Sequence, residues 1–172
     1  KTRKADSRGL QALPVLAPHL FPFQASCVEH HLRVGSAGCF LDTGLGKTEV
    51  QLEFCQKAME ATNLTPIYWT PLAVAGQTRR RAEKWGYEAV VIRDQSEAKR
   101  GVINICNYDR RGKIDPDFFG VVSCDEASIF KSFTGTTRRE LAEEADLRAD
   151  RWSVLIDHYP TPGSSSESIR IF

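Results

Sequence analysis

Two short stretches of the chain contain the residue types that handle phosphate groups and metal ions. The first spans residues 39–48 and reads CFLDTGLGKT, an apolar run that gives way to two glycines and then to Lys47 and Thr48. Gly44 and Gly46 allow backbone conformations that are closed to residues with a Cβ atom, so several N–H groups can point at one anion. The stretch predicts a phosphate-binding loop between a strand and a helix.

In such a loop the role of each side chain follows from its chemistry. Lys47 can reach the β- and γ-phosphates of a nucleotide, and the Thr48 hydroxyl can hold Mg²⁺. The helix that begins here adds the positive end of its dipole. Leu41 stands where the general pattern G-x-x-x-x-G-K-[ST] has its first glycine. The alternative is a glycine-rich turn that precedes Lys-Thr by chance, and an expected strand before it and helix after it count against this.

The second stretch is an apolar run, residues 120–124, that ends in Asp125 and Glu126. Asp125 would meet the Mg²⁺ held by Thr48 from the other side of the metal, and Glu126 would orient and deprotonate an attacking water. Adjacent acids at the end of a strand are also common as solvated turn residues. Because the glycine loop lies upstream in the same chain, we favour the catalytic interpretation.

Hydrophobic periodicity and turn residues predict the elements that position these two stretches. Strands are expected at 67–70, 89–92, 102–106, 120–124 and 153–156, with helices at about 24–34, 48–62, 71–85 and 136–147. Strands that alternate with helices predict an α/β fold with a mainly parallel sheet covered by helices on both faces. The carboxyl ends of parallel strands meet at one edge, so both stretches should open onto that edge.

Bulk composition narrows the class of protein. The chain has 172 residues, 41% of them hydrophobic and 26% charged, which is ordinary for one globular domain. Its formal net charge of +1 indicates no overall basic field, so a surface for nucleic acid would have to be local. No stretch has the apolar length of a membrane span. Single cysteines without a C-x-x-C pair indicate reduced, buried thiols of a cytosolic protein, at Cys27, Cys39, Cys55, Cys106 and Cys124.

Gln24 follows Leu-Phe-Pro-Phe shortly upstream of the loop, and its carboxamide offers the donor and acceptor that the edge of adenine requires. In chain order the motifs are Gln24, Gly44 to Thr48, Thr70-Pro71-Leu72, Asn107-Tyr108-Asp109 and Asp125-Glu126-Ala127-Ser128. This order resembles the first RecA-like domain of a superfamily 2 helicase. It is most similar to Swi/Snf-like DEAD/DEAH-type translocases of phages and bacteria, over roughly residues 20–140.

The resemblance implies a three-layer P-loop fold that binds ATP and Mg²⁺. The residues expected to bind ATP are Gln24, Thr43, Gly44, Leu45, Gly46, Lys47 and Thr48. Thr48 and Asp125 would hold the metal, while Lys47 and Glu126 would serve the hydrolysis of ATP. The nucleic-acid backbone would meet motif Ia, represented by Thr70, Pro71 and Gln77, and motif Ib, represented by Asn107 and Tyr108. The expected nucleic acid is DNA rather than RNA, and the expected compartment is the cytoplasm of a bacterial or phage-infected cell.

The expected domain organisation is a loosely ordered lead-in at 1–19, the RecA-like domain at 20–160 and a flexible tail at 161–172. Where the family has its motif III, this chain reads Tyr-Pro-Thr-Pro at 159–162. A second RecA-like domain with its arginine finger is absent from the sequence and would have to come from another domain or chain. The chain should therefore bind nucleotide but hydrolyse ATP weakly or not at all on its own.

Two other classes of protein stay open at this point. A different P-loop enzyme, such as a small-molecule kinase, would share the loop but not Gln24 or the Asp-Glu pair. A module that binds nucleotide or nucleic acid without turnover would suit the altered motif III. The three consecutive arginines Arg79, Arg80 and Arg81 spread around a predicted helix, so one or two of them could bind phosphate, and a solvated face explains them equally well.

Overall fold

The computed structural model describes residues 9–42 and 44–125 of the chain, within the first of two units, Lys1–Ile129 and Phe130–Phe172. The predicted helix at 136–147 and strand at 153–156 lie outside the described residues. The α-helices are α1 (Pro22–Val34), α2 (Lys47–Thr62) and α3 (Leu72–Lys84). The strands are β1 (Pro66–Thr70), β2 (Ala89–Ile92), β3 (Ile103–Asn107) and β4 (Val121–Cys124), and three short 3₁₀ helices are η1 (Gln95–Glu97), η2 (Tyr108–Lys113) and η3 (Pro116–Phe118).

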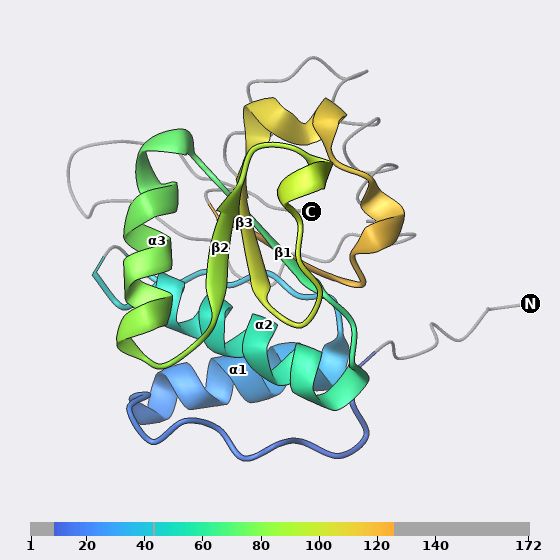
Figure 1. Ribbon diagram of the computed structural model, residues 1–172. Helices are drawn as coiled ribbons and strands as arrows, with labels where there is room; N and C mark the ends of the chain where they lie inside the picture. The colour runs from blue at the N-terminus through green and yellow to red at the C-terminus, as the bar shows by residue number, and fades with distance from the viewer. Residues whose placement is uncertain (1–8, 43, 126–172) are drawn as a thin grey trace, which may run out of the picture. The chain divides into compact units, whose positions relative to one another are not determined.

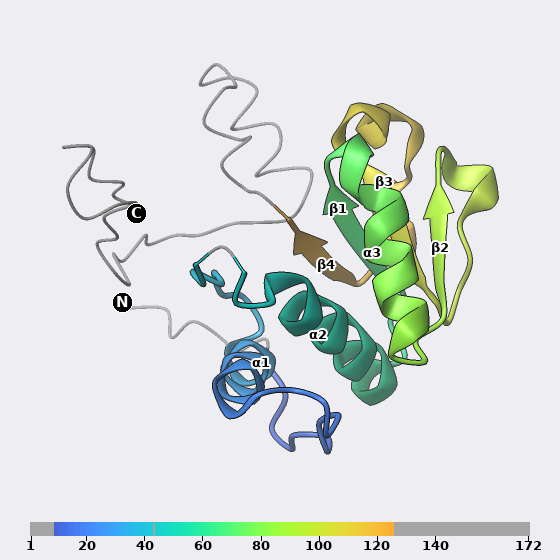
Figure 2. The same cartoon turned by 90° about the vertical axis from the view of Figure 1, so that its left-hand side faces the viewer.

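The four strands form one sheet in the order β2-β3-β1-β4, and every pair of neighbours is parallel (Figure 1, and Figure 2 for β4). Each strand was expected within two residues of its observed bounds, because short apolar runs between polar turns are typical of strands buried on both faces. The predicted α/β class with a parallel sheet and flanking helices is confirmed. All four strands end at one edge, and β1 and β4 are neighbours there.

The two faces of the sheet are covered differently (Figure 2). Helices α2 and α3 lie on one face, where Leu52 and Cys55 of α2 join Tyr68, Ile103 and Ile105 in one apolar cluster. The other face carries a second cluster, which includes Ile67, Ile92 and Cys106 together with side chains from η3 and the loops. Among the described residues, full α-helices therefore cover one face of the sheet and 3₁₀ helices with loops cover the other.

Helix α1 packs on α2 rather than on the sheet (Figure 1). Val28 and Leu32 of α1 are buried in a third cluster with Val50, Ala58 and Val121. None of the helices in the described part of the chain is long and apolar enough to cross a membrane.

Residues 9–19, the described part of the segment expected to be a loosely ordered lead-in, pack against the rest of the domain. The leucines of this segment pack against the cluster that α1 and α2 share, because an apolar residue recurs every third position, at Leu10, Leu13 and Leu16. The backbone N–H of Leu10 also donates to the carbonyl of Leu32 at 2.7 Å. Apolar spacing that continues upstream of a predicted helix is the sequence signal that indicates such packing.

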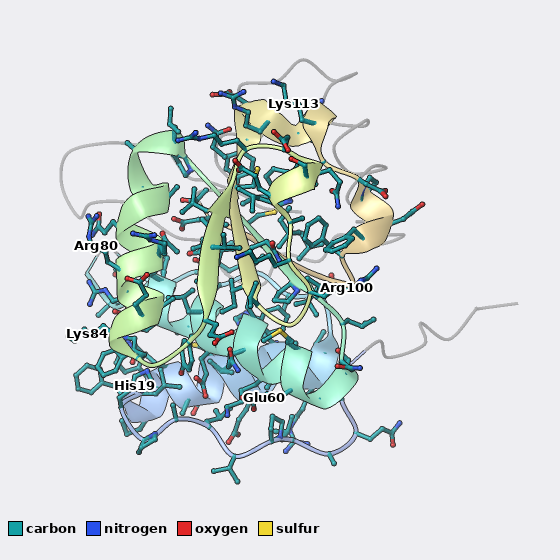
Figure 3. The ribbon with its side chains drawn as sticks, viewed as in Figure 1. His19, Glu60, Arg80, Lys84, Arg100 and Lys113 are labelled. Atoms are coloured by element: carbon teal, nitrogen blue, oxygen red, sulfur yellow. The ribbon has the colours of Figure 1, made fainter. Side chains whose placement is uncertain are left out.

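Polar contacts tie the end of the lead-in to two helices. Glu53 of α2 is completely buried, and its carboxylate accepts hydrogen bonds from the backbone N–H of Ala17, at 2.7 Å, and from the hydroxyl of Tyr87. The ring of His19 stacks on Trp85, just after α3, with centroids 3.8 Å apart. Figure 3 shows His19 beside Lys84, whose ammonium lies 4.7 Å from the centroid of the Trp85 ring.

The strand expected before the glycine loop is not observed, and residues 36–42 belong to no helix or strand. Cys39 and Leu41 are partly buried against the cluster of α1 and α2, whereas Phe40 between them is 46% exposed. The apolar run that suggested a strand therefore packs partly on this cluster without pairing in the sheet. Within the described residues β4 pairs with β1 alone, so the sheet ends at β4.

Buried thiols give the fold a predictable response to alkaline pH. Burial raises the pKa of Cys55 from its ordinary value of 9.0 to about 12, and that of Cys124 to about 11. Burial also raises the pKa of Tyr87, and its hydrogen bond to Glu53 adds to the effect. Groups whose pKa is raised in the folded protein stabilise it below their unfolded pKa, and this stabilisation is lost as pH rises toward the folded pKa.

We therefore expect the free energy of unfolding to fall steeply above pH 9. The Cys55 thiol alone should account for about 1.4 kcal/mol of the loss between pH 7 and pH 10. Urea denaturation at both pH values measures the loss for the wild type and for Cys55→Ala. The variant should be less stable at pH 7 because of its cavity, but its loss on going to pH 10 should be smaller. Equal losses in the two proteins would contradict this account.

Candidate functional site

The loop before α2 has the backbone conformation that the glycines predicted. Gly44 and Gly46 both lie in the left-handed region, with φ of +87° and +76°. Gly46 is the N-cap of α2, so the helix begins immediately at Lys47. A Cβ atom on Gly46 would lie 2.3 Å from Nε2 of Gln24, whereas a Cβ on Gly44 would meet nothing within 4 Å. Gly46 is thus required by backbone conformation and by close packing, and Gly44 by conformation alone.

The side chain of Lys47 reaches back across the loop. Its Nζ donates a hydrogen bond to the carbonyl oxygen of Leu41 at 2.9 Å. Leu41, at the position of the first glycine in the general pattern, thus contributes its backbone to the site while its side chain packs on the apolar cluster. An ammonium group has three N–H donors, so this bond leaves Lys47 able to donate to an anion in the loop.

Gln24 joins α1 to the loop through both ends of its carboxamide. Its Nε2 donates to the carbonyl of Leu45 at 3.0 Å, and its Oε1 accepts from the backbone N–H of Phe21 at 3.0 Å. The residue is 4% exposed. A carboxamide has two N–H donors and two acceptor sites, so one of each is left beyond these bonds. The structure therefore gives Gln24 a supporting role that the sequence did not predict.

An exposed aromatic pair lies beside Gln24 and was not singled out from the sequence. Phe21 and Phe23 are 64% and 41% exposed, and their rings stack nearly parallel with centroids 6.0 Å apart. Exposed aromatic rings offer a flat apolar surface against which another planar ring can stack. The signal in the sequence was present, because the two phenylalanines flank the proline that begins α1.

The two predicted metal ligands come from neighbouring elements. Thr48 lies in the first turn of α2, and Asp125 directly follows β4. Asp125 is 9% exposed, and its Oδ2 accepts from the Thr70 hydroxyl at 3.4 Å. Its backbone N–H donates to the carbonyl of Trp69 at 2.8 Å, and its carbonyl accepts from the Tyr108 hydroxyl at 2.6 Å. The carboxylate is thus positioned by β1 and by η2 as well as by its own strand.

Within the described residues no three His, Cys, Asp or Glu side chains gather as a metal cluster. One carboxylate and one hydroxyl are nevertheless a suitable donor set for Mg²⁺, which usually keeps several waters and takes few ligands from the protein. They would suit Zn²⁺ poorly, because zinc sites are typically built from three or four nitrogen, sulfur or carboxylate ligands.

A polar pair, the buried Tyr68 and the partly buried Gln51, lies beside Cys124, the residue before Asp125, and was also missed from the sequence. The hydroxyl of Tyr68 on β1 donates to Oε1 of Gln51 at 2.5 Å, and Nε2 of Gln51 donates to the carbonyl of Cys124 at 3.0 Å. Burial raises the pKa of Tyr68 well above its usual range, and the charge of Asp125 raises it further. Tyr68 therefore stays protonated at physiological pH.

The residues predicted to meet nucleic acid occupy different environments. Thr70 is fully buried, which does not suit a direct contact with nucleic acid and suits the orientation of Asp125. Gln77 is exposed on α3, and Pro71 is partly exposed at its N-cap. Asn107 is 7% exposed, and its Oδ1 has no hydrogen-bond partner within the described residues. The ring of Tyr108 stacks on Trp69 with centroids 6.2 Å apart.

Two of the three consecutive arginines have carboxylate partners. Arg79 pairs with Glu83 at 3.6 Å along α3, and Arg81 pairs with Glu49 of α2 at 2.8 Å. Arg80 has no ion-pair partner within the described ranges and extends from α3 away from the sheet (Figure 3). Arg79 therefore belongs to a solvated face of α3, and Arg81 links α3 to α2. Among the three arginines, Arg80 is the one that could bind a phosphate without first breaking an ion pair seen in the described residues.

Several predicted features lie outside the described residues. They include Thr43 in the loop, the proposed catalytic base Glu126, and the stretch 159–162 that stands at motif III.

Comparisons with known proteins add little to this site. No protein-family model matches the chain. A 37-residue stretch is 49% identical to part of a protein of Mycobacterium tuberculosis described as "ADP-ribose pyrophosphatase". The match covers 22% of this chain and 18% of that protein. It is too short to show a family.

The two loop glycines provide a matched test of the observed geometry. Gly44→Ala should cost only the strain of a left-handed alanine, about 1–2 kcal/mol. Gly46→Ala should cost the same strain and, in addition, about 1–3 kcal/mol because the new Cβ displaces Gln24 from its bond to Leu45. Urea denaturation measures both losses, and the Gly46 variant should also show faster amide exchange at 44–47. Equal losses for the two variants would contradict the close packing between Gly46 and Gln24.

Proposed function

We propose that this chain is the ATP-binding half of a nucleic-acid-dependent motor of the superfamily 2 helicase and translocase type. One observation carries the proposal. Gly44 and Gly46 adopt left-handed backbone conformations, and helix α2 begins immediately after them with Lys47 and Thr48. Strand β4 ends at the same edge of the sheet and is followed directly by Asp125. Backbone N–H groups, an ammonium, a hydroxyl and a carboxylate at one edge match what a triphosphate with Mg²⁺ requires.

The base of the nucleotide would lie beside α1. The remaining donor and acceptor of Gln24 suit the edge of adenine, and the exposed rings of Phe21 and Phe23 suit stacking against a purine. Because Gln24 also supports Leu45, binding of the base and the shape of the phosphate loop would be coupled through one side chain.

In the proposed reaction Mg²⁺, when bound, would supply positive charge that neutralises charge developing on the phosphates. Lys47 would stabilise the transferring phosphoryl group, and Thr48 and Asp125 would hold the cation. Glu126 is the proposed base for the attacking water. An arginine from a second RecA-like domain or chain would supply the opposing positive charge, which contributes roughly 10³–10⁵ in rate in related enzymes. This chain alone should therefore turn over ATP weakly or not at all.

The proposed partner is a nucleic acid, DNA rather than RNA, held at the carboxyl edge of the sheet. Pro71, the exposed Gln77 and the unpaired Arg80 lie along α3, and Asn107 and Tyr108 lie at the end of β3. Figure 3 shows Lys113 of η2 at the end of the molecule opposite Glu60, so a further cation lies at this edge. We place the protein in the cytoplasm of a bacterial or phage-infected cell.

The first test is binding of ATP with Mg²⁺ by calorimetry. Lys47→Ala should weaken binding by about 1.5–3 kcal/mol, or roughly 10- to 150-fold, because a charge-assisted contact to the phosphates is lost. Lys57→Ala, on the same helix but paired with Glu60, is the matched control and should bind as the wild type does. Unchanged affinity in Lys47→Ala would contradict the proposed function.

A second test separates base recognition from loop support by Gln24. Loss of loop support in Gln24→Ala should lower the affinity for ATP and GTP alike. Loss of base recognition should instead reduce the ratio of the two affinities, and we expect this ratio to move toward one. Calorimetric titrations of both nucleotides measure it, with Gln56→Ala, which deletes a carboxamide bonded to Glu60 on α2, as the control. A ratio that stays the same in Gln24→Ala would limit Gln24 to its structural role.

A further inference from the structure

We propose that the free edge of strand β2 pairs with the same edge of a second copy of this chain, in antiparallel orientation about a two-fold axis. Within the described residues β2 pairs with β3 alone, and Figure 2 shows it as the outermost strand on its side of the sheet. The proposal does not depend on the nucleotide site, because β2 and β4 are at opposite ends of the sheet.

The outward-facing backbone groups of β2 follow from its pairing with β3. The carbonyl of Glu88 accepts a hydrogen bond from the N–H of Ile103 at 2.9 Å, so the backbone groups of Glu88 face β3. Successive residues of a strand direct their N–H and C=O groups to opposite sides, and every second residue after Glu88 faces β3 as well. Ala89 and Val91 therefore direct theirs away from the sheet, where no partner lies among the described residues.

This edge lacks the residues that usually protect an edge strand. The segment Ala89–Ile92 reads AVVI and contains neither a proline nor a charged residue. Natural edge strands typically carry such residues, because a row of unpaired N–H and C=O groups is a template for another strand. Val90 and Val91 are only partly buried, so a strand laid against β2 would also cover apolar surface.

Backbone groups already in use at both ends of β2 favour one register. The N–H of Tyr87 donates to a carbonyl of α3 at 3.0 Å, and the N–H of Arg93 donates to Oε2 of Glu97 at 2.7 Å. Pairing Ala89 with Val91 of the second copy needs neither group, and the two-fold axis repeats the pair, which gives four hydrogen bonds. A shift by one pair in either direction would place a carbonyl opposite an N–H that is already used.

The same register brings an arginine to a groove with acidic and aromatic walls. Tyr87 and Val91 pack on the cluster that α2 and α3 share with the sheet, so Arg93, two residues further, points to that same face. In the proposed pairing Arg93 lies opposite Tyr87 of the second copy. Beside Tyr87 is a groove of about 500 Å³ that Glu83 and Glu88 also line.

Arg93 and this groove are complementary in charge. Arg93 is exposed and has no carboxylate partner within the described ranges. A guanidinium group can stack on an aromatic ring and bond a carboxylate, and the ring of Tyr87 is held in place by the hydrogen bond of its hydroxyl to Glu53. Because the two-fold axis forms this contact twice, the charges favour a second copy over an unrelated strand.

The expected product is one sheet of eight strands, four from each copy, with α2 and α3 of both copies on the same face. A junction of one short strand from each copy should bury less than the roughly 1,200–2,000 Å² of a typical stable complex. We therefore expect a weak, reversible dimer whose fraction rises with protein concentration.

Cysteine cross-linking tests the register. Val90 would lie opposite its own copy at the axis, in a non-hydrogen-bonded pair with about 4.5 Å between Cα atoms, which a disulfide can span. Val91 would lie opposite Ala89 instead, so Val91→Cys is the matched control. Under mild oxidation Val90→Cys should form a covalent dimer, whereas Val91→Cys and the wild type, with its native cysteines, should not. Equal cross-linking of the two variants would overturn the proposal.

Sedimentation velocity over a concentration series tests the arginine contact. Arg93→Glu and Glu83→Arg should each weaken the dimer by roughly tenfold or more, and the double variant should regain affinity because the pair is reversed. Arg33→Glu, at an exposed arginine near the end of α1, is the matched control and should dimerise as the wild type does.

Two results of this measurement would show the inference to be wrong. One is a wild type that stays monomeric up to about 1 mM, whether or not its β2 edge binds an added extended peptide of another sequence. The other is a folded double variant that dimerises no better than the single variants.

Discussion

The position of α2 on the sheet is the constraint from which the candidate site follows. Leu52 and Cys55 are completely buried against β1 and β3, and they fix the rotation of the helix about its own axis. Thr48 and Gln51 precede them at positions i and i+3 of the same i, i+3, i+4, i+7 stripe. Because the apolar and the polar residues lie on the same side of α2, the packing of Leu52 and Cys55 in the core also determines the direction in which Thr48 and Gln51 point.

Parallel pairing supplies the second half of the arrangement. The strands β1 and β4 run in the same direction as neighbours, so Thr70 and Asp125 reach the same edge together. Thr70 and Tyr108 provide hydrogen-bond partners for Asp125 there, and a buried group without a partner costs about 1–3 kcal/mol. Oδ1 of Asn107, at the end of the neighbouring strand β3, has no partner among the described residues. On another side of α2, Glu53 is also fully buried, and its carboxylate accepts a hydrogen bond from the backbone N–H of Ala17. The helix is therefore held by apolar contacts along its length and by buried hydrogen bonds on two sides.

The strands and helices of the described residues were predicted well from the sequence, because hydrophobic periodicity and turn residues can be recognised within a short stretch of chain. It also predicted the left-handed glycines, since few backbones other than such a loop need them at Gly44 and Gly46. The strand predicted at residues 39–41 was wrong, because a short apolar run can pack on a helix pair without pairing in a sheet. The pairing of Tyr68 with Gln51 could not be predicted, because it depends on the rotation of α2 against β1. For the same reason the double use of Gln24 became visible only in three dimensions.

The attachment of the lead-in also determines the order in which the chain can fold. Ala17 donates a hydrogen bond to Glu53, which lies 36 positions later in the sequence. His19 stacks on Trp85, which is synthesised later still. Contacts between residues so far apart carry an entropy cost of loop closure. The lead-in is synthesised before both partners, so it can dock only after α2 and the end of α3 have been made, and until then the carboxylate of Glu53 lacks the N–H of Ala17. We expect this segment to be the first to detach when the folded domain opens locally.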